Sequence, residues 1–414
     1  MSANILSHTF PNQLVLVAEP MPSLQSAAFT FLVPAGSVHD PADRSGLASF
    51  VSEMATRGAA GRDNRQLVLD LDNLGVQRND SITDAHAYYG GVTVAENLFP
   101  ALAIYADVLR RAHLPPEEFE MVRQIMLQEI QAIEDEPAHK LGLELRNRFY
   151  PTPWGRPSQG DRPSVELTSI DDIRAFFQTH YQAAGTVLGV AGQFDWSALK
   201  EAVGQWFETW TSGPGETPRQ TPVVPTTTHL THDAQQTQIG IAYPSVPYRD
   251  DRYFEAWGAV GVLSGGMSSR LFTEVRERRG LCYSIHASCH SLRDGGGVFC
   301  HAGTTADRAQ ETLDVTIQEL RRLAQGVEQH ELDRLKARIK SALILQQESS
   351  AARSSSIARD WYHLGRVRTL DEVSERIDRL SCETINAYLE ECPPRDFTVV
   401  TLGPSPLEMP DGVS

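Results

Sequence analysis

Three polar side chains on one predicted helix could do chemistry together. The stretch Ser45 to Gly58 reads SGLASFVSEMATRG, and at about 100° per residue it predicts a helix with one apolar stripe. Ser49, Ser52 and Glu53 lie together on the opposite side, between about 140° and 240° from the stripe. Such a face can point at a partner protein, a cavity or simply water. The stripe that would pack on a core consists of Leu47, Phe50, Val51 and Met54.

The size and charge of the chain limit its class. At 414 residues the chain exceeds what one hydrophobic core usually organises, so we expect two domains. Hydrophobic residues make up 41% and charged residues 22% of the sequence, which is a globular balance. The formal net charge of -16 disfavours nucleic acid as a partner, because phosphate contacts need a basic surface.

The sequence indicates neither a membrane protein nor a protein of an oxidising compartment. The N-terminal sequence MSANILSHTFPNQ lacks a basic segment followed by an apolar run, and no stretch reaches the length of a bilayer span. The five cysteines are an odd number without a C-x-x-C pair, which fits reduced thiols. We therefore expect a cytoplasmic protein that does not bind membranes.

A segment rich in proline and threonine separates two similar halves. Residues 213–232, GPGETPRQTPVVPTTTHLTH, have no apolar period and are typical of an extended linker. Residues 1–212 and 233–414 each begin with a strand-like run, then a loop and a helix that ends in Arg-Gly, which is a weak internal repeat. We predict an α+β fold with two domains, each a mostly antiparallel sheet with helices packed on one face.

Five segments together resemble the M16 metallopeptidases, which include insulin-degrading enzyme, the mitochondrial processing peptidase and small bacterial members. Their order and spacing match the family over nearly the whole chain. The resemblance implies two homologous domains in a clam-shell arrangement around an unfolded peptide. The segments are the GLASF helix, QEIQAIEDEP at 128–137, PWGRPSQG at 153–160, VLGVAGQFD at 187–195 and GGMSSRLFTEVRERRGLCYS at 265–284.

Active members of this family carry H-x-x-E-H on the first helix, and the matching positions here are changed. In that motif two imidazoles one turn apart bind zinc while the glutamate handles the protons of the water. The match puts Ser49 at the first histidine, Ser52 at the glutamate and Glu53 at the second histidine. We therefore expect no metal cofactor in this chain, and zinc in a partner subunit.

Glu129 matches the family's third zinc ligand. An acid among apolar side chains needs a partner or a raised pKa, and the plain interpretation is a buried acid paired with an arginine. Serine hydroxyls are poor zinc ligands, and Glu53 with Glu129 would suit Mg²⁺ or Ca²⁺ better. On a helical wheel Glu129 lies within about 80° of Phe119, Val122, Ile125, Met126 and Ile133.

The second half matches the family where active members carry an arginine and a tyrosine seven residues apart. In RERRGLCY these residues are Arg276 and Tyr283. In the family they reach the peptide and the scissile carbonyl, which suits a guanidinium that grips a carbonyl and a phenol that donates to an oxyanion. Taken singly, Arg276 would be an ordinary charged helix residue and Tyr283 a half-buried strand aromatic.

Three functions are consistent with these residues. The chain could be the non-zinc subunit of a heterodimeric M16 peptidase, in which Arg276 and Tyr283 complete the active site of a zinc-bearing paralogue around a peptide substrate. It could be an inert scaffold, like the family's core subunits in the respiratory bc1 complex. It could act alone with altered metal chemistry. The retained arginine and tyrosine favour the first function, and the two serines disfavour the third.

Overall fold

Two sheets, each with its own hydrophobic core, organise the residues that the computed structural model describes, which are 5–213, 218 and 223–413. Within these residues, no helix is both long and apolar enough to cross a bilayer. The first unit contains residues 1–132, 156–219 and 344–371, and the second contains residues 133–155, 220–343 and 372–414.

The sheet of the first unit has the strand order β1-β2-β8-β3-β7-β6, and all neighbours are antiparallel except β2 and β8. Side chains alternate between its faces, so that Phe29 and Phe31 of β3 enter the main core while Leu32 faces the other way. The strands are β1 (Leu6–Thr9), β2 (Val15–Pro20), β3 (Ser26–Val33), β6 (Gln77–Ile82), β7 (Ala87–Val94) and β8 (Val187–Gly192), with the short hairpin β4 (Gly58–Ala59) and β5 (Arg62–Asp63) beside them in sequence.

The helices of the first unit supply the rest of its core. The apolar stripe of α1 is buried as predicted, since Phe50 and Met54 are 0% exposed. The helices are α1 (Leu47–Ala55), α2 (Asn64–Asn73), α3 (Leu98–Arg111), α4 (Phe119–Glu134), α6 (Arg162–Leu167), α7 (Ile170–His180), α8 (Trp196–Phe207) and α12 (Ser350–Leu364).

The second sheet repeats the topology of the first. Its order is β11-β12-β10-β13-β9, and only β13 and β9 are parallel. Strands β3, β7, β6, β8 and β2 thus correspond to β10, β12, β11, β13 and β9, with the same neighbours and directions. The predicted α+β fold with two similar, mostly antiparallel domains is confirmed. The strands are β9 (Thr227–Thr231), β10 (Gln236–Ser245), β11 (Cys282–Ser291), β12 (Gly296–Thr305) and β13 (Thr398–Gly403).

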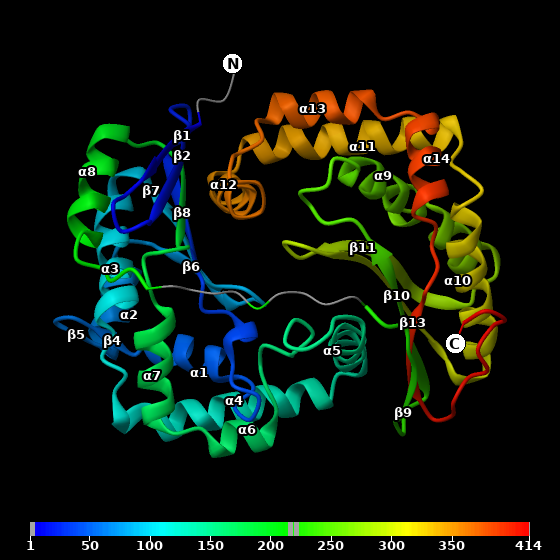
Figure 1. Cartoon of the computed structure of the whole chain (residues 1–414), viewed down its shortest axis with the longest axis horizontal. Coiled ribbons are helices and arrows are strands. Elements are labelled where there is room, and N and C mark those ends of the chain that lie inside the picture. The colour runs from blue at the N-terminus through cyan, green and yellow to red at the C-terminus, as the bar shows by residue number, and fades with distance from the viewer. Residues whose placement is uncertain (1–4, 214–217, 219–222, 414) are drawn as a thin grey trace. The chain divides into compact units, whose positions relative to one another are not determined.

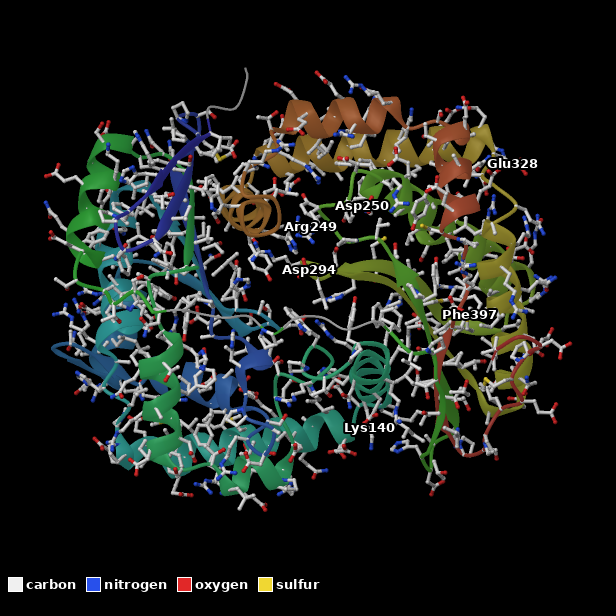
Figure 2. All side chains as sticks on the ribbon, viewed as in Figure 1. Lys140, Arg249, Asp250, Asp294, Glu328 and Phe397 are labelled. Carbon is white, nitrogen blue, oxygen red and sulfur yellow. The ribbon has the colours of Figure 1, made fainter. Side chains whose placement is uncertain are left out.

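Helices and side chains complete the second unit (Figure 2). Phe397 is 3% exposed and its ring lies 5.8 Å from that of Tyr243 in the core. At the surface, Arg249 and Asp294 form an ion pair of 2.7 Å. The helices are α5 (Pro137–Phe149), α9 (Tyr253–Ser264), the π-helix η4 (Phe272–Arg278), α10 (Ala309–Leu323), α11 (Gln329–Gln347), α13 (Leu370–Arg379) and α14 (Cys382–Glu391).

Strand β9 stands where the sequence predicted a linker. Thr227–Thr231 pairs in parallel with β13, because β-branched threonines suit a half-buried strand. The expected linker of residues 213–232 is therefore wrong at its C-terminal end. Its residues 214–217 and 219–222 lie outside the described part of the chain.

Two equivalent helices are exchanged between the two halves of the sequence. Helix α5 precedes the predicted linker but belongs to the second unit, whereas α12 follows it and belongs to the first. Figure 1 shows α12 beside β8, in agreement with the contact of Ala358 with Gly189. The boundaries at 1–212 and 233–414 miss both exchanges, because helical periodicity reveals an apolar face but not the sheet that will cover it.

Helix α12 covers the second face of the first sheet, which adds to the predicted arrangement of helices on one face. A Cβ on Gly189 would lie 2.4 Å from the carbonyl oxygen of Ser354, so the close approach of helix and strand requires glycine. Gly240 of β10 takes the same role beneath α5, where a Cβ would lie 3.1 Å from Leu145. The small apolar cluster under α12 contains Val17, Leu32, Val187, Ile357 and Ala358.

A buried ion pair also joins α12 to the first sheet. Arg353 is 1% and Glu19 is 5% exposed. The Nε of Arg353 donates a hydrogen bond to Oε2 of Glu19 at 2.7 Å, and its Nη2 lies 2.7 Å from the same oxygen. Each charge therefore depends on the other for its stability in the interior.

Candidate functional site

A buried carboxylate fixes the start of α1. Asp40 is 4% exposed, and its two oxygens accept hydrogen bonds from the backbone N–H groups of Gly46 and Ala48, both at 2.8 Å. Burial raises the pKa of Asp40 to about 7, against the opposing effect of these bonds. Gly46 has a φ of 92° and lies against the backbone of Gly160, where no side chain fits. The loop PWGRPSQG thus determines where α1 begins.

The two serines of the degenerate motif bond to the protein's own fold. Ser49 Oγ donates to the carbonyl oxygen of Ser158 at 2.6 Å, and Ser52 Oγ donates to the hydroxyl of Tyr89 at 3.0 Å. The Tyr89 hydroxyl lies 2.7 Å from that of Tyr181, so Ser52 ends a chain of three buried hydroxyls. Ser52 is 8% exposed and points inward, which the wheel of α1 alone did not predict.

The third motif position, Glu53, stays at the surface in an acidic region. Its carboxylate lies 3.4 Å from Arg57 and is 45% exposed. Partial desolvation is the main cause of the raised pKa of Glu129, and desolvation raises the pKa of Asp80 to about 6. The negative charge of Glu53 adds to both shifts. Asp80 could not be predicted from the sequence, because β6 approaches α1 only in the folded chain.

Glu129 is exposed rather than enclosed by apolar side chains. On α4, Val122 and Met126 are buried, but none of residues 128–134 is. The last turns of the helix therefore extend beyond the part of the core that covers its beginning. No arginine pairs with Glu129 within the described residues, so the expected buried ion pair is wrong.

The donors at these four positions do not fit a zinc ion. Zinc in proteins takes imidazole, thiolate or carboxylate ligands, usually four, whereas Ser49 and Ser52 offer neutral hydroxyls that already donate to other groups. In the described ranges, no three histidine, cysteine or acidic side chains are grouped so as to hold a metal. We therefore derive no metal chemistry for the face of α1.

The structure brings Arg276 and Tyr283 together. The guanidinium carbon of Arg276 lies 5.2 Å from the ring centroid of Tyr283 and 4.7 Å from that of Phe272, which is cation–π distance on both sides. Tyr283 is 84% exposed. Among the residues described, neither the guanidinium of Arg276 nor the hydroxyl of Tyr283 has a hydrogen-bond or carboxylate partner, so both can bind an external ligand.

A β-bulge directs Tyr283 outward. Along β11, Cys282 pairs with Thr304 and Ser284 with Gly303, so Tyr283 is the extra residue between two consecutive pairs. Bulges re-aim side chains and are frequent beside active sites. Neither the bulge nor the place of Phe272 beneath Arg276 was predicted. The bulge depends on the register of β11 against β12, and the contact of Phe272 with Arg276 depends on the π-helical turn that carries both residues.

Comparisons with known proteins cover most of the chain. The family model for the insulinase domain of peptidase family M16 matches residues 15–161, and the model for the M16 inactive domain matches residues 168–339. A protein of Rickettsia bellii named as an uncharacterized zinc protease is 26% identical over 98% of this chain and 99% of its own. The zinc protease YmxG of Bacillus subtilis, also named as uncharacterized, is 26% identical over 97% and 98%.

Two solved structures share the fold over nearly the full length. An M16 inactive-domain protein from Pseudomonas fluorescens superposes with a TM-score of 0.91 at 21% identity and covers 98% of this chain and 100% of its own. A protease from Helicobacter pylori has a TM-score of 0.89 at 19% identity, with the same coverage.

Proposed function

Because the chain belongs to the M16 peptidase family, we propose that it is the non-zinc subunit of a heterodimeric peptidase. In this proposal a zinc-bearing M16 paralogue holds the metal, and this chain contributes residues that bind the peptide. The relatives named as zinc proteases support a role in proteolysis, while the bonded hydroxyls of Ser49 and Ser52 argue against a metal in this chain. We place the proposed heterodimer in the cytoplasm, in line with the five free cysteines of this chain.

Arg276 and Tyr283 would have different roles towards the peptide. A guanidinium forms charge-assisted hydrogen bonds with a backbone carbonyl, which positions the substrate. A phenol hydroxyl placed near the scissile carbonyl donates to the negative oxygen that develops during attack, and such a donor acts mostly on the transition state. Phe272 restrains Arg276 from one side, which limits the entropy lost on binding.

One observation carries this proposal. Tyr283 projects from a bulge with 84% of its surface exposed, and beside it lies an arginine without a carboxylate partner in the described residues. An exposed tyrosine and an arginine without an ion pair add little to the stability of a fold, since surface substitutions usually change it by about 0.5 kcal/mol or less. Their arrangement suits an external ligand better.

The test is peptide cleavage by this chain mixed with a zinc-bearing M16 paralogue. We expect cleavage only in the mixture. Tyr283→Phe should lower kcat by roughly 100-fold while the complex still forms, because it removes one donor at the oxyanion. Arg276→Ala should also weaken peptide binding and so raise KM.

Arg278→Ala is the matched control for Arg276→Ala. Arg278 lies on the same π-helix and its loss changes the net charge equally, but its guanidinium is paired with Glu274. The control should cleave like the parent. If Tyr283→Phe and Arg276→Ala mixtures also cleave like the parent, the two residues are structural and the chain is a scaffold.

A further inference from the structure

A small pocket in the second unit is lined by groups that suit an anion. It lies between the end of α9, the loop of residues 265–269 and one face of α11, with a volume of about 270 Å³. Pockets for drug-sized ligands usually measure about 300 to 1,000 Å³. This one therefore fits a small group rather than a large molecule.

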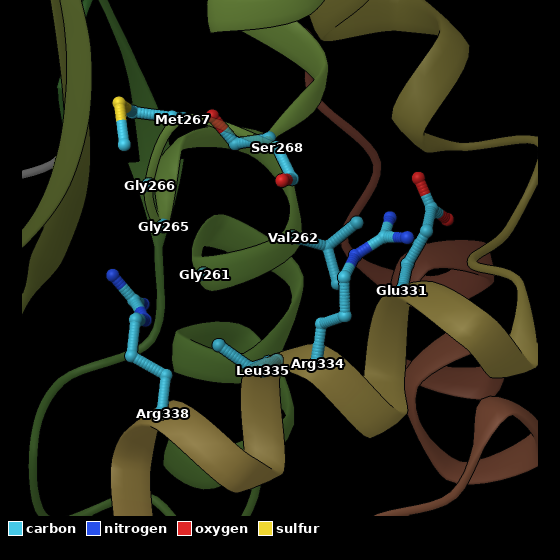
Figure 3. A pocket seen from close by; sticks show the side chains of 11 residues that line it. Gly261, Val262, Gly265, Gly266, Met267, Ser268, Glu331, Arg334, Leu335 and Arg338 are labelled. Carbon is cyan, nitrogen blue, oxygen red and sulfur yellow. The ribbon is translucent and has the colours of Figure 1, made fainter. Parts of the chain in front are cut away.

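Two arginines supply positive charge to the pocket. Arg334 and Arg338 are one turn apart on α11 and both line it, but Figure 3 shows their side chains diverging, that of Arg338 towards Gly265 and that of Arg334 towards Glu331. Within the described residues, neither guanidinium has an ion pair or a hydrogen bond. The guanidinium of Arg338 lies against the loop, since a Cβ on Gly265 would be only 2.5 Å from its Nη2. Glycine at that position leaves room for the arginine.

The pocket's own carboxylate does not neutralise these charges. Glu331 is the acidic residue among those that line the pocket, and it is already engaged. Its Oε1 accepts from Arg270 Nε at 2.8 Å, and its Oε2 accepts from Arg270 Nη2 at 2.6 Å and from the N–H of Glu328 at 2.9 Å. The negative charge of Glu331 is thus paired with Arg270. Figure 3 shows this carboxylate on the side of Arg334, so that Arg338 is the less compensated of the two arginines.

The loop adds neutral donors next to the arginines. The hydroxyls of Ser268 and Ser269 have no hydrogen-bond partner in the described part of the chain, and the same holds for the backbone N–H groups of Gly266, Met267 and Ser268. Met267 is 79% exposed, so the loop is open to solvent. A ligand that enters here meets donors on both sides.

We propose that this pocket binds a small oxyanion group, a phosphate or a carboxylate, between Arg338 and the loop of residues 265–269, while Arg334 on the other side of the pocket adds positive charge. A guanidinium presents parallel N–H groups that match two oxygens of such a group, and charge-assisted bonds of this kind are the strong ones. The site is independent of the peptidase partnership and can be tested on this chain alone.

The first test is calorimetric titration of the purified chain with inorganic phosphate at constant ionic strength. The double variant Arg334→Ala/Arg338→Ala should weaken binding by roughly tenfold or more, mainly through the loss of Arg338. Lys336→Ala/Lys340→Ala is the matched control, because it removes the same charge from the same helix at side chains that contact Asp378 instead. The control should bind like the parent.

A second titration separates the two sources of the oxyanion. A short peptide with a free C-terminal carboxylate is compared with its amidated form. Binding of phosphate alone supports a free phosphate ligand, and binding of the free peptide but not the amide supports a peptide carboxylate. Arg338→Lys, which keeps the charge but loses the fork, should bind at an intermediate level.

Two results would overturn the proposal. One is that the parent binds neither phosphate nor the free peptide at millimolar concentrations. The other is that the two double variants lose affinity equally, which would indicate a diffuse charge effect. Thermal unfolding of each variant confirms that it is folded, and Ser268→Ala provides a milder change on the loop side if Arg338 proves to be needed for stability.

Discussion

The face of α1 and the pair of Arg276 and Tyr283 differ in where their polar atoms are directed. Ser49 and Ser52 donate to a carbonyl and a tyrosine of the same unit, whereas the polar groups of the half-buried Arg276 and the exposed Tyr283 have no partner in the described residues. Polar atoms that are satisfied inside a fold act on its stability. Polar atoms at the surface without a protein partner can instead be substituted at little cost in stability. Measurements of stability and of peptide binding therefore test the two regions independently.

The largest loss of stability is expected from the buried ion pair under α12. Arg353→Met should lower the free energy of unfolding by about 3 to 5 kcal/mol, because it leaves the charge of Glu19 buried without compensation. Urea denaturation measures the change. The double variant Glu19→Leu/Arg353→Met should recover most of it, and a double variant as unstable as the single one would contradict this explanation.

Asp40 should make stability depend on pH. Its pKa is raised from 3.8 to about 7, so the folded chain binds this proton more tightly than the unfolded chain does. The protonated carboxyl of Asp40 therefore contributes fully to the free energy of unfolding below about pH 4, and this contribution is lost as pH rises towards 7. The loss is up to about 4 kcal/mol, at about 1.4 kcal/mol per pKa unit. In Asp40→Asn the free energy of unfolding, measured by urea denaturation between about pH 4 and pH 7, should no longer fall for this reason. If the free energy of unfolding changes with pH in the same way in the parent and in Asp40→Asn, Asp40 is not the group responsible.

A smaller loss is expected at the end of the hydroxyl chain. Ser52→Ala removes one buried hydrogen bond to Tyr89, which keeps its bond to Tyr181, so the cost should be about 1 kcal/mol. Ser341→Ala is the control, since that hydroxyl is exposed and bonds only within its own helix. A Ser52 variant as stable as the control would mean that the hydroxyl chain is not structural.

The smallest effect on stability is expected at the pair proposed to bind the peptide. Arg276→Ala and Tyr283→Phe should each change the free energy of unfolding by less than about 0.5 kcal/mol, as surface substitutions usually do. Thermal unfolding beside Arg278→Ala checks this. A loss comparable to that of Ser52→Ala would remove the difference between the two regions.

Local patterns predicted the elements better than the packing. The stripe of Phe50 and Met54 was recognisable because burial follows the helical period. Arg276 and Tyr283 were singled out by the resemblance of one segment to the M16 family, and their role stays a prediction. The exposed position of Glu129 was not predictable, because it depends on where the core ends along α4. The inward direction of Ser52 depends on Tyr89, a residue of another strand.

The other differences between the predicted and the observed fold arise from contacts between segments that are far apart in the sequence. The strand β9 forms because β13, which lies far along the chain, offers a free edge. The exchange of α5 and α12 leaves no local mark in the sequence, since an amphipathic helix looks the same whichever sheet it covers. The glycines that accept these helices, Gly189 and Gly240, could have been noticed as interruptions in strand-like runs.

The exchange of helices sets the order in which a newly made chain can mature. The ribosome finishes the last strand of the first sheet at residue 192, but α12 at residues 350–364 emerges much later. Until then, the nascent chain carries Val17, Leu32 and Val187 without their cover and Glu19 without its arginine. Apolar surface of this kind is what chaperones bind. The first unit to be synthesised must therefore wait for a late helix before it is complete.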